Sequence, residues 1–99
     1  MSPINKKKLN LIRIKLDKLD KLDNDLLKLI KKRSSLVNEV LKVKIHKKEI
    51  IDQKRISFIL KKIKKKSIQN NIDTKITNRI WKNMIWSFID YEKRNFRKK

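Results

Sequence analysis

The sequence contains no glycine and only one proline, Pro3, in 99 residues. These two residue types form most hairpins and tight turns, so the interior of the chain lacks the usual turn signals. We therefore expect long, uninterrupted helices. At this length the chain forms one domain at most, over 1–99, and so small a domain buries only a modest share of its surface. Association with a second chain would bury more.

Apolar residues recur at helical spacing along three stretches of the chain. They predict an all-α fold with one long and two shorter helices, over about 5–46, 48–66 and 73–97. Ser2 and Pro3 suit the N-cap and the first position of the first helix, and Asp73 suits the N-cap of the third. The polar stretch 67–71 is expected to be a loop.

The first predicted helix is too long for a compact monomer of this size. At 1.5 Å per residue, its apolar stripe from about Leu9 to Ile45 is on the order of 55 Å long. That length exceeds the diameter of a 99-residue globule. The stripe must therefore contact another chain.

The formal net charge is +20, which raises nucleic acid as a partner. Most of this charge is lysine, whereas arginine is the usual residue for bidentate recognition of bases and phosphates. Basic runs such as 64–66 lie opposite apolar positions and are interpreted mainly as a solvated face. No segment resembles a recognition helix with a glycine-containing turn. A small basic helical nucleic-acid-binding protein is one alternative, and a structural coiled-coil dimerisation module is another.

The chain has no cysteine and a single histidine, His46, so it can form neither a disulfide nor a thiolate or histidine-cluster metal site. We expect no metal and no cofactor. No apolar run approaches the roughly 20 residues of a membrane span, and the polar residues 1–5 do not resemble a signal peptide. A cytoplasmic location is the expectation.

Ionisable residues occupy core-facing positions in all three predicted helices. In the first, Arg33 and Lys44 point almost the same way as the apolar stripe. In the second, Asp52 lies on the stripe with Arg55 three residues on, where the two can form a helix salt bridge. In the third, Glu92 continues an apolar stripe, which predicts a partly desolvated carboxyl group.

Each of these positions also has an ordinary explanation. The cations can snorkel to solvent, the pair in the second helix can be a surface pair, and Glu92 can lie at an exposed helix end. Taken together, however, the three helices bring several charges to the core, with cations in the majority. Because unpaired buried charges are costly, a buried pocket for an anion accounts for the pattern most simply.

These residues resemble the all-helical (AroQ-class) chorismate mutases. The first helix of that family typically reads as an Ile/Leu-Asp pair, then Leu-Leu-x-Leu-Leu, Arg and Val-x-x-x-Lys. The matching residues here are Leu22-Asp23, Leu26 to Ile30, Arg33, Val40 and Lys44. Asp52 to Arg55 is similar to the Asp-x-x-Arg of the second helix, and Ile72-Asp73, Arg79 to Trp81 and Met84-Ile85 continue the similarity into the third. The resemblance covers roughly residues 9–94.

The resemblance implies an isomerase that converts chorismate to prephenate in phenylalanine and tyrosine biosynthesis. It implies an intertwined homodimer in which the long first helices pair and each site borrows an arginine from the partner chain. Arg33 would hold one substrate carboxylate, and Lys44 would contact the other carboxylate and the ether oxygen. Asp52 and Arg55 would line the wall formed by the second helix.

The chain departs from the family pattern at several positions. The borrowed arginine, counted back from Arg33, falls at Leu16, and Arg13 lies three residues earlier, with Lys15 also near. The acid that usually follows the second-helix arginine is Ile56, and Glu49 is a possible substitute.

Two further departures lie in the third helix. Phe88 stands where the family often has serine, and Glu92 where it often has a glutamine that faces the ether oxygen. Because a carboxylate would repel that oxygen, Glu92 must carry a proton there to donate a hydrogen bond. We therefore expect activity to fall as pH rises.

Overall fold

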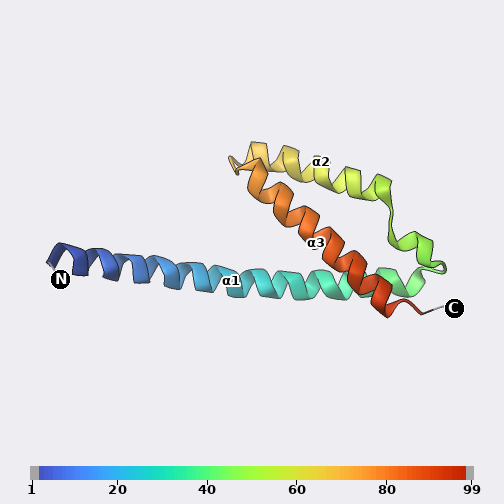
Figure 1. Cartoon of the computed structure of the whole chain (residues 1–99), viewed down its shortest axis with the longest axis horizontal. Helices are drawn as coiled ribbons and strands as arrows, with labels where there is room; N and C mark the ends of the chain where they lie inside the picture. Colours follow the sequence, from blue (N-terminus) through green and yellow to red (C-terminus); the bar gives the residue numbers. More distant parts are fainter. Residues whose placement is uncertain (1–2, 98–99) are drawn as a thin grey trace. The chain divides into compact units, whose positions relative to one another are not determined.

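The computed structural model describes residues 3–97, and within this range it contains only helices and connecting turns. The long helix α1 spans Pro3–Val43, a short 3₁₀ helix η1 spans Lys47–Ile50, and α2 and α3 span Gln53–Gln69 and Thr74–Asn95 (Figure 1). The predicted all-α class is confirmed. Within the same residues, no helix is both long and apolar enough to cross a membrane.

The chain divides into two units, residues 1–35 and residues 36–99. In the first unit, the described residues form one continuous stretch of α1. Ser2, the expected N-cap, lies outside the described residues. The large apolar side chains of this stretch are exposed, from 41% at Leu9 to 64% at Leu27. They are Leu9, Leu11, Ile12, Ile14, Leu16, Leu19, Leu22, Leu26, Leu27, Leu29 and Ile30.

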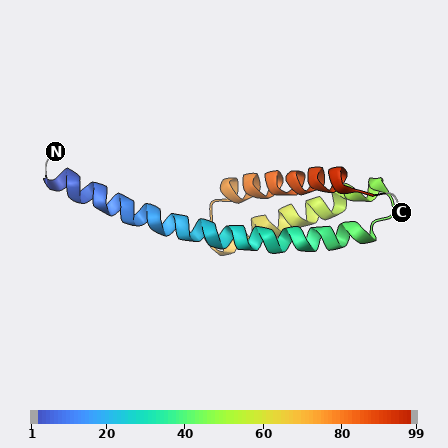
Figure 2. The same cartoon turned by 90° about the horizontal axis from the view of Figure 1, so that it is seen from below.

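The second unit holds the buried core. Helices α2 and α3 form a hairpin and lie side by side (Figure 2). Apolar side chains from the end of α1, from η1 and from α3 are buried together, namely Leu41, Ile50, Ile85 and Ile89. Half-buried residues, among them Ile56 and Ile59 of α2, pack against them. A buried hydrogen bond of 2.8 Å between the hydroxyl groups of Ser67 and Thr77 also joins α2 to α3.

The connection between α1 and α2 differs from the expectation. Helix α1 ends at Val43, not near residue 46, and the segment expected to begin a second helix at 48 is the 3₁₀ turn η1. The physical reason is a side chain that competes with helical hydrogen bonding: the Glu49 carboxylate accepts the backbone N–H groups of Ile45 and His46. These donors therefore do not extend α1.

Helix α2 is displaced along the chain from its expected range of 48–66. It begins only at Gln53, because Asp52 caps it, and it continues through the polar residues 67–69 that were expected to be loop. A Schellman motif ends it: Ile72 N–H donates to the Ser67 carbonyl at 2.8 Å, and Asn71 adopts a left-handed φ of 55°. Asparagine tolerates that conformation, so the chain turns here without glycine.

Helix α3 begins where the sequence predicts it. Asp73 is the N-cap, and its carboxylate accepts the backbone N–H of Lys75 at 2.8 Å. The helix ends at Asn95, two residues before the expected limit of 97. Glu92 therefore lies in its last turn and faces the interior of the second unit, not solvent.

Candidate active site

A buried ion pair joins the two ends of the second unit. Lys44, the first residue after α1, donates a hydrogen bond from Nζ to Oε1 of Glu92 on α3, at 2.9 Å. The side chains of Lys44 and Glu92 are only 18% and 8% exposed. Removing two charges from water is costly, and their attraction offsets that cost only when the contact is close. Ion pairs of this kind are weak contributors to stability, which directs attention to a functional role.

Lys44 also lines a pocket of about 730 Å³ that opens to solvent beside the turn between α1 and α2. The pocket is lined by Val43, Lys44, Glu49, Ile51, Asp52, Gln53 and Lys54. Two residues predicted from the sequence, Lys44 and Asp52, thus line one open pocket, and Glu92 contacts Lys44 without lining it. A partly shielded cation at the edge of an open pocket can bind an anionic ligand through a charge-assisted hydrogen bond.

Glu49, also in the pocket lining, holds the turn together. Its Oε2 atom accepts the backbone N–H of Ile45 at 2.7 Å and that of His46 at 2.9 Å. The hydrogen bond from His46, followed by that from Ile45, lowers the pKa of Glu49 below its ordinary value of 4.5. Glu49 is therefore ionised at neutral pH.

Asp52 and Arg55 do not form the salt bridge that their spacing allows. Asp52 precedes α2 as its N-cap, and its Oδ1 accepts the backbone N–H of Arg55 at 3.0 Å. The Arg55 guanidinium lies over the ring of Phe58, 5.5 Å from its centroid, and both residues are exposed. Asp52 was expected within a helix, where it could pair with a side chain, but as the N-cap of α2 it binds the backbone.

Two positions that depart from the family pattern are apolar and packed. Ile56 lies half-buried against the core of the second unit, so no acid occupies that part of α2. Phe88 is also half-buried and lies one turn before Glu92 on α3, so the two share a helix face.

The remaining predicted residues, Arg13 and Arg33, belong to the first unit. Arg13 is exposed, as is Leu16, the position where the family pattern places the borrowed arginine. Arg33 is half-buried, and its Nη1 atom is shielded from solvent.

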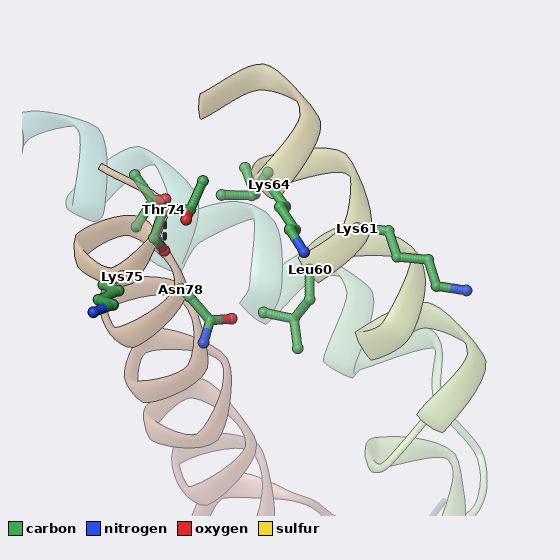
Figure 3. Close-up of a pocket in the computed structure, with 8 residues that line it drawn as sticks. Leu60, Lys61, Lys64, Thr74, Lys75 and Asn78 are labelled. Atoms are coloured by element: carbon green, nitrogen blue, oxygen red, sulfur yellow. Dashed lines mark hydrogen bonds between the residues drawn. The ribbon is translucent and has the colours of Figure 1, made fainter. Parts of the chain in front are cut away.

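A second pocket, of about 310 Å³, lies between α2 and α3 (Figure 3). Its lining includes three lysines but no acid: Leu60, Lys61, Ile63, Lys64, Thr74, Lys75, Thr77 and Asn78. Figure 3 shows the amines of Lys61 and Lys75 pointing away from the space between the two helices. The cations do not converge there, and none of the residues predicted from the sequence lines this pocket.

Helical periodicity did not predict two features of the site. The Lys44–Glu92 contact joins positions 48 residues apart, which helical periodicity cannot relate. The capping role of Glu49 was also missed, although a signal existed: an acid three residues after His46 is the spacing at which a side chain bonds back to the N-cap backbone.

Comparison with known proteins gives a match to one family model, described as chorismate mutase type II, over residues 16–93. A comparison with curated proteins and one with solved structures gave no significant match. The family match begins at Leu16 in the first unit and extends through Lys44, Asp52 and Glu92 to Lys93 in the last turn of α3. Since it spans well over half of the sequence, the chain belongs to the chorismate mutase type II family, the all-helical isomerases that convert chorismate to prephenate.

Proposed function

We propose that Arg33 and Lys44 are the cations that bind chorismate and stabilise its rearrangement. By the family resemblance, Arg33 holds one carboxylate of the dianionic substrate and Lys44 holds the other. Lys44 also donates to the ether oxygen. The observation that carries this proposal is the buried Lys44–Glu92 pair beside an open pocket, on residues that the family match includes.

The reaction needs no nucleophile and no metal from the protein. It is an intramolecular Claisen rearrangement, in which the ether C–O bond breaks as a new C–C bond forms within the same molecule. The protein's task is to hold the flexible substrate in its chair-like reactive conformer and to stabilise negative charge that grows on the ether oxygen. A bidentate arginine suits the first task, and the ammonium group of Lys44 suits the second.

We assign Glu92 the task of holding the Lys44 ammonium group at the ether oxygen, because Glu92 Oε1 accepts a hydrogen bond from Lys44 Nζ at 2.9 Å. An ammonium group has three N–H donors, so Lys44 can contact Glu92 and the substrate together. Donation from Glu92 itself to the ether oxygen would require a protonated carboxyl group, which is not the form that pairs with an ammonium ion. Glu92→Gln removes the charge of Glu92 and should lower activity by loosening Lys44. Activity equal to that of the parent protein would remove Glu92 from this role.

Asp52, Arg55 and Phe88 complete the proposed substrate-binding surface. Asp52 lines the same pocket as Lys44, and Phe88 precedes Glu92 by one turn. Arg55 stacks on Phe58 and is exposed, so it can turn toward a dianion without losing a buried partner. We place the reaction in the reducing cytoplasm, because a chain without cysteine has no disulfide bond that would need oxidising conditions.

We further propose that the functional form is a homodimer in which the first unit of each chain pairs with a second copy. The exposed apolar side chains between Leu9 and Ile30 support this, because a soluble monomer rarely exposes so large a continuous apolar stripe. The family match reaches into this stripe from Leu16 onward. Arg13, on the same helix, is the residue we assign to the partner's site.

Mixed dimers test whether Arg13 acts across the interface. Arg13→Ala and Lys44→Ala are each expected to lose most activity, and refolding an equal mixture should restore about a quarter of the parent activity. Half of the dimers are then mixed, and each of these has one intact site of two. If Arg13 acts within its own chain, the mixture stays inactive. If Lys15 serves instead, Arg13→Ala retains activity and Lys15→Ala loses it.

The function itself is tested by incubating the purified chain with chorismate and following loss of its absorbance, with the product identified by NMR. Prephenate formation that Arg33→Ala and Lys44→Ala both abolish supports the assigned site. Absence of turnover in the parent protein overturns it. Binding to duplex DNA at physiological salt, measured on the same preparation, then tests the alternative that the net charge first suggested.

A further inference from the structure

We propose that Glu49 is a positioning residue for Lys44, acting through the backbone of the turn that follows α1. The inference rests on the proposed function, since it matters for catalysis only if Lys44 contacts the substrate. It assigns Glu49 a different task from that of a substitute for the acid missing at residue 56. In this role Glu49 need not touch the substrate.

The geometry of the turn carries the proposal. Lys44 is the first residue beyond α1, and its backbone N–H still reaches the Leu41 carbonyl at 3.2 Å. The next two N–H groups, those of Ile45 and His46, both donate to a single carboxylate oxygen, Oε2 of Glu49. The Glu49 N–H returns to the His46 carbonyl at 3.0 Å. One side chain thus fixes the backbone of the two residues directly after Lys44.

Side-chain packing within the segment 44–49 supplies little of this rigidity. The segment 44–49 contains no proline, and Ile45, His46 and Glu49 are all exposed, so packing does not fix them. Without the Glu49 carboxylate, the two N–H groups would bond to water, and the backbone at Lys44 would be free to fray. Hydrogen bonds from an ionised acceptor are roughly twice as strong as neutral ones.

The position of Lys44 is sensitive to this backbone. Its ammonium group contacts Glu92 at 2.9 Å. Lys44 also lines the pocket that Glu49 lines, so a shift of the backbone at residue 44 moves the ammonium group relative to both. A catalytic group displaced by about 1 Å can lose on the order of 100-fold in rate. We therefore expect Glu49→Ala to lower kcat/KM by about 10- to 100-fold, through both kcat and KM, because Lys44 is assigned to a substrate carboxylate as well as to the ether oxygen.

Two variants and a matched control separate positioning from folding. Glu49→Gln keeps an oxygen that can accept both N–H groups, so it should retain more activity than Glu49→Ala. Asp73→Ala removes another carboxylate that accepts a backbone N–H, but at the start of α3. Asp73→Ala should lower the melting temperature at least as much as Glu49→Ala does, and it should leave kcat/KM unchanged. Equal losses of activity in Asp73→Ala and Glu49→Ala would overturn the proposal, because Glu49 would then act only on stability.

A double-mutant cycle with Lys44 provides the decisive readout. Binding of prephenate, the reaction product, is measured by calorimetry for the parent, Glu49→Ala, Lys44→Ala and the double variant. If Glu49 acts through Lys44, its removal weakens binding in the parent but has little further effect once Lys44 is absent. Independent, additive losses would refute the inference.

These results also separate this inference from the proposed function. If the parent protein turns over chorismate and Lys44→Ala is inactive, but Glu49→Ala equals the parent, only the positioning role fails. If Lys44→Ala remains active, the proposed function fails together with it.

Discussion

Removal of Lys44 is expected to destabilise the second unit strongly, because it leaves the Glu92 carboxylate buried without its cation. The Glu92 side chain is 8% exposed and that of Lys44 is 18% exposed, so solvent can replace little of the lost contact. Breaking a buried pair by deleting one partner typically costs 3–5 kcal/mol. Because Lys44 is not fully buried, we expect the lower end of that range, about 3 kcal/mol for Lys44→Ala.

This loss is large enough to measure directly. For a domain of about 100 residues, it corresponds to a decrease of roughly 12–24 °C in melting temperature. The assay is urea unfolding followed by circular dichroism, at one fixed protein concentration because association stabilises the folded state. The midpoint should fall without a change in the denaturant slope.

The apolar double variant Lys44→Met with Glu92→Leu distinguishes a functional pair from a structural one. Replacing a buried ion pair by apolar residues of similar volume is often neutral or stabilising. We therefore expect this variant to regain most of the lost stability and to show no chorismate turnover. A loss below about 1 kcal/mol in Lys44→Ala, or turnover in the apolar double variant, would refute the reasoning.

Three further predictions follow from individual contacts. Ser67→Ala should cost about 1–3 kcal/mol in urea unfolding, because it leaves the buried Thr77 hydroxyl with only a long contact of 3.4 Å to the Thr74 carbonyl; recovery in Ser67→Ala with Thr77→Val confirms the cause, and an unchanged midpoint in the single variant contradicts it. Ile56→Glu, which restores the acid of the family pattern, should lower stability by about 1–3 kcal/mol, because Ile56 packs on the core; an equally stable and more active protein would oppose this. The pKa of Glu49 is lowered in the folded state, so its contribution to stability is present above pH 4.5 and is lost as pH falls through the lowered value. Glu49→Gln should therefore flatten this part of the acid-unfolding curve, and an unchanged acid limb would contradict the assignment.

Much of the fold was predictable because it depends on local signals. Helical periodicity gives the all-α class, and Asp73 marks the start of α3 through a cap made within two residues of itself. The predicted start of α2 was too early, because apolar periodicity does not distinguish an acid that caps a helix from an acid inside it. Only the structure shows Asp52 binding backbone ahead of the helix.

The site was predictable only in part, for a related reason. The sequence indicates that Lys44 and Glu92 face inward, since each lies on an apolar stripe. Their direct contact depends on the angle between elements and on where α1 ends, and neither is encoded in spacing. The end of α1 is set by the Glu49 side chain, which competes for backbone donors that periodicity assigns to the helix.

The most direct test of the central claim is the rate of chorismate consumption by the parent protein and by Lys44→Ala under conditions where both are folded. Loss of one preorganised donor to a developing negative charge typically lowers kcat by about 100- to 1000-fold. We predict a decrease of at least about 100-fold in Lys44→Ala, with prephenate as the parent protein's product. Equal rates in the two proteins, or no rate in the parent, would contradict the assignment of the buried lysine to catalysis.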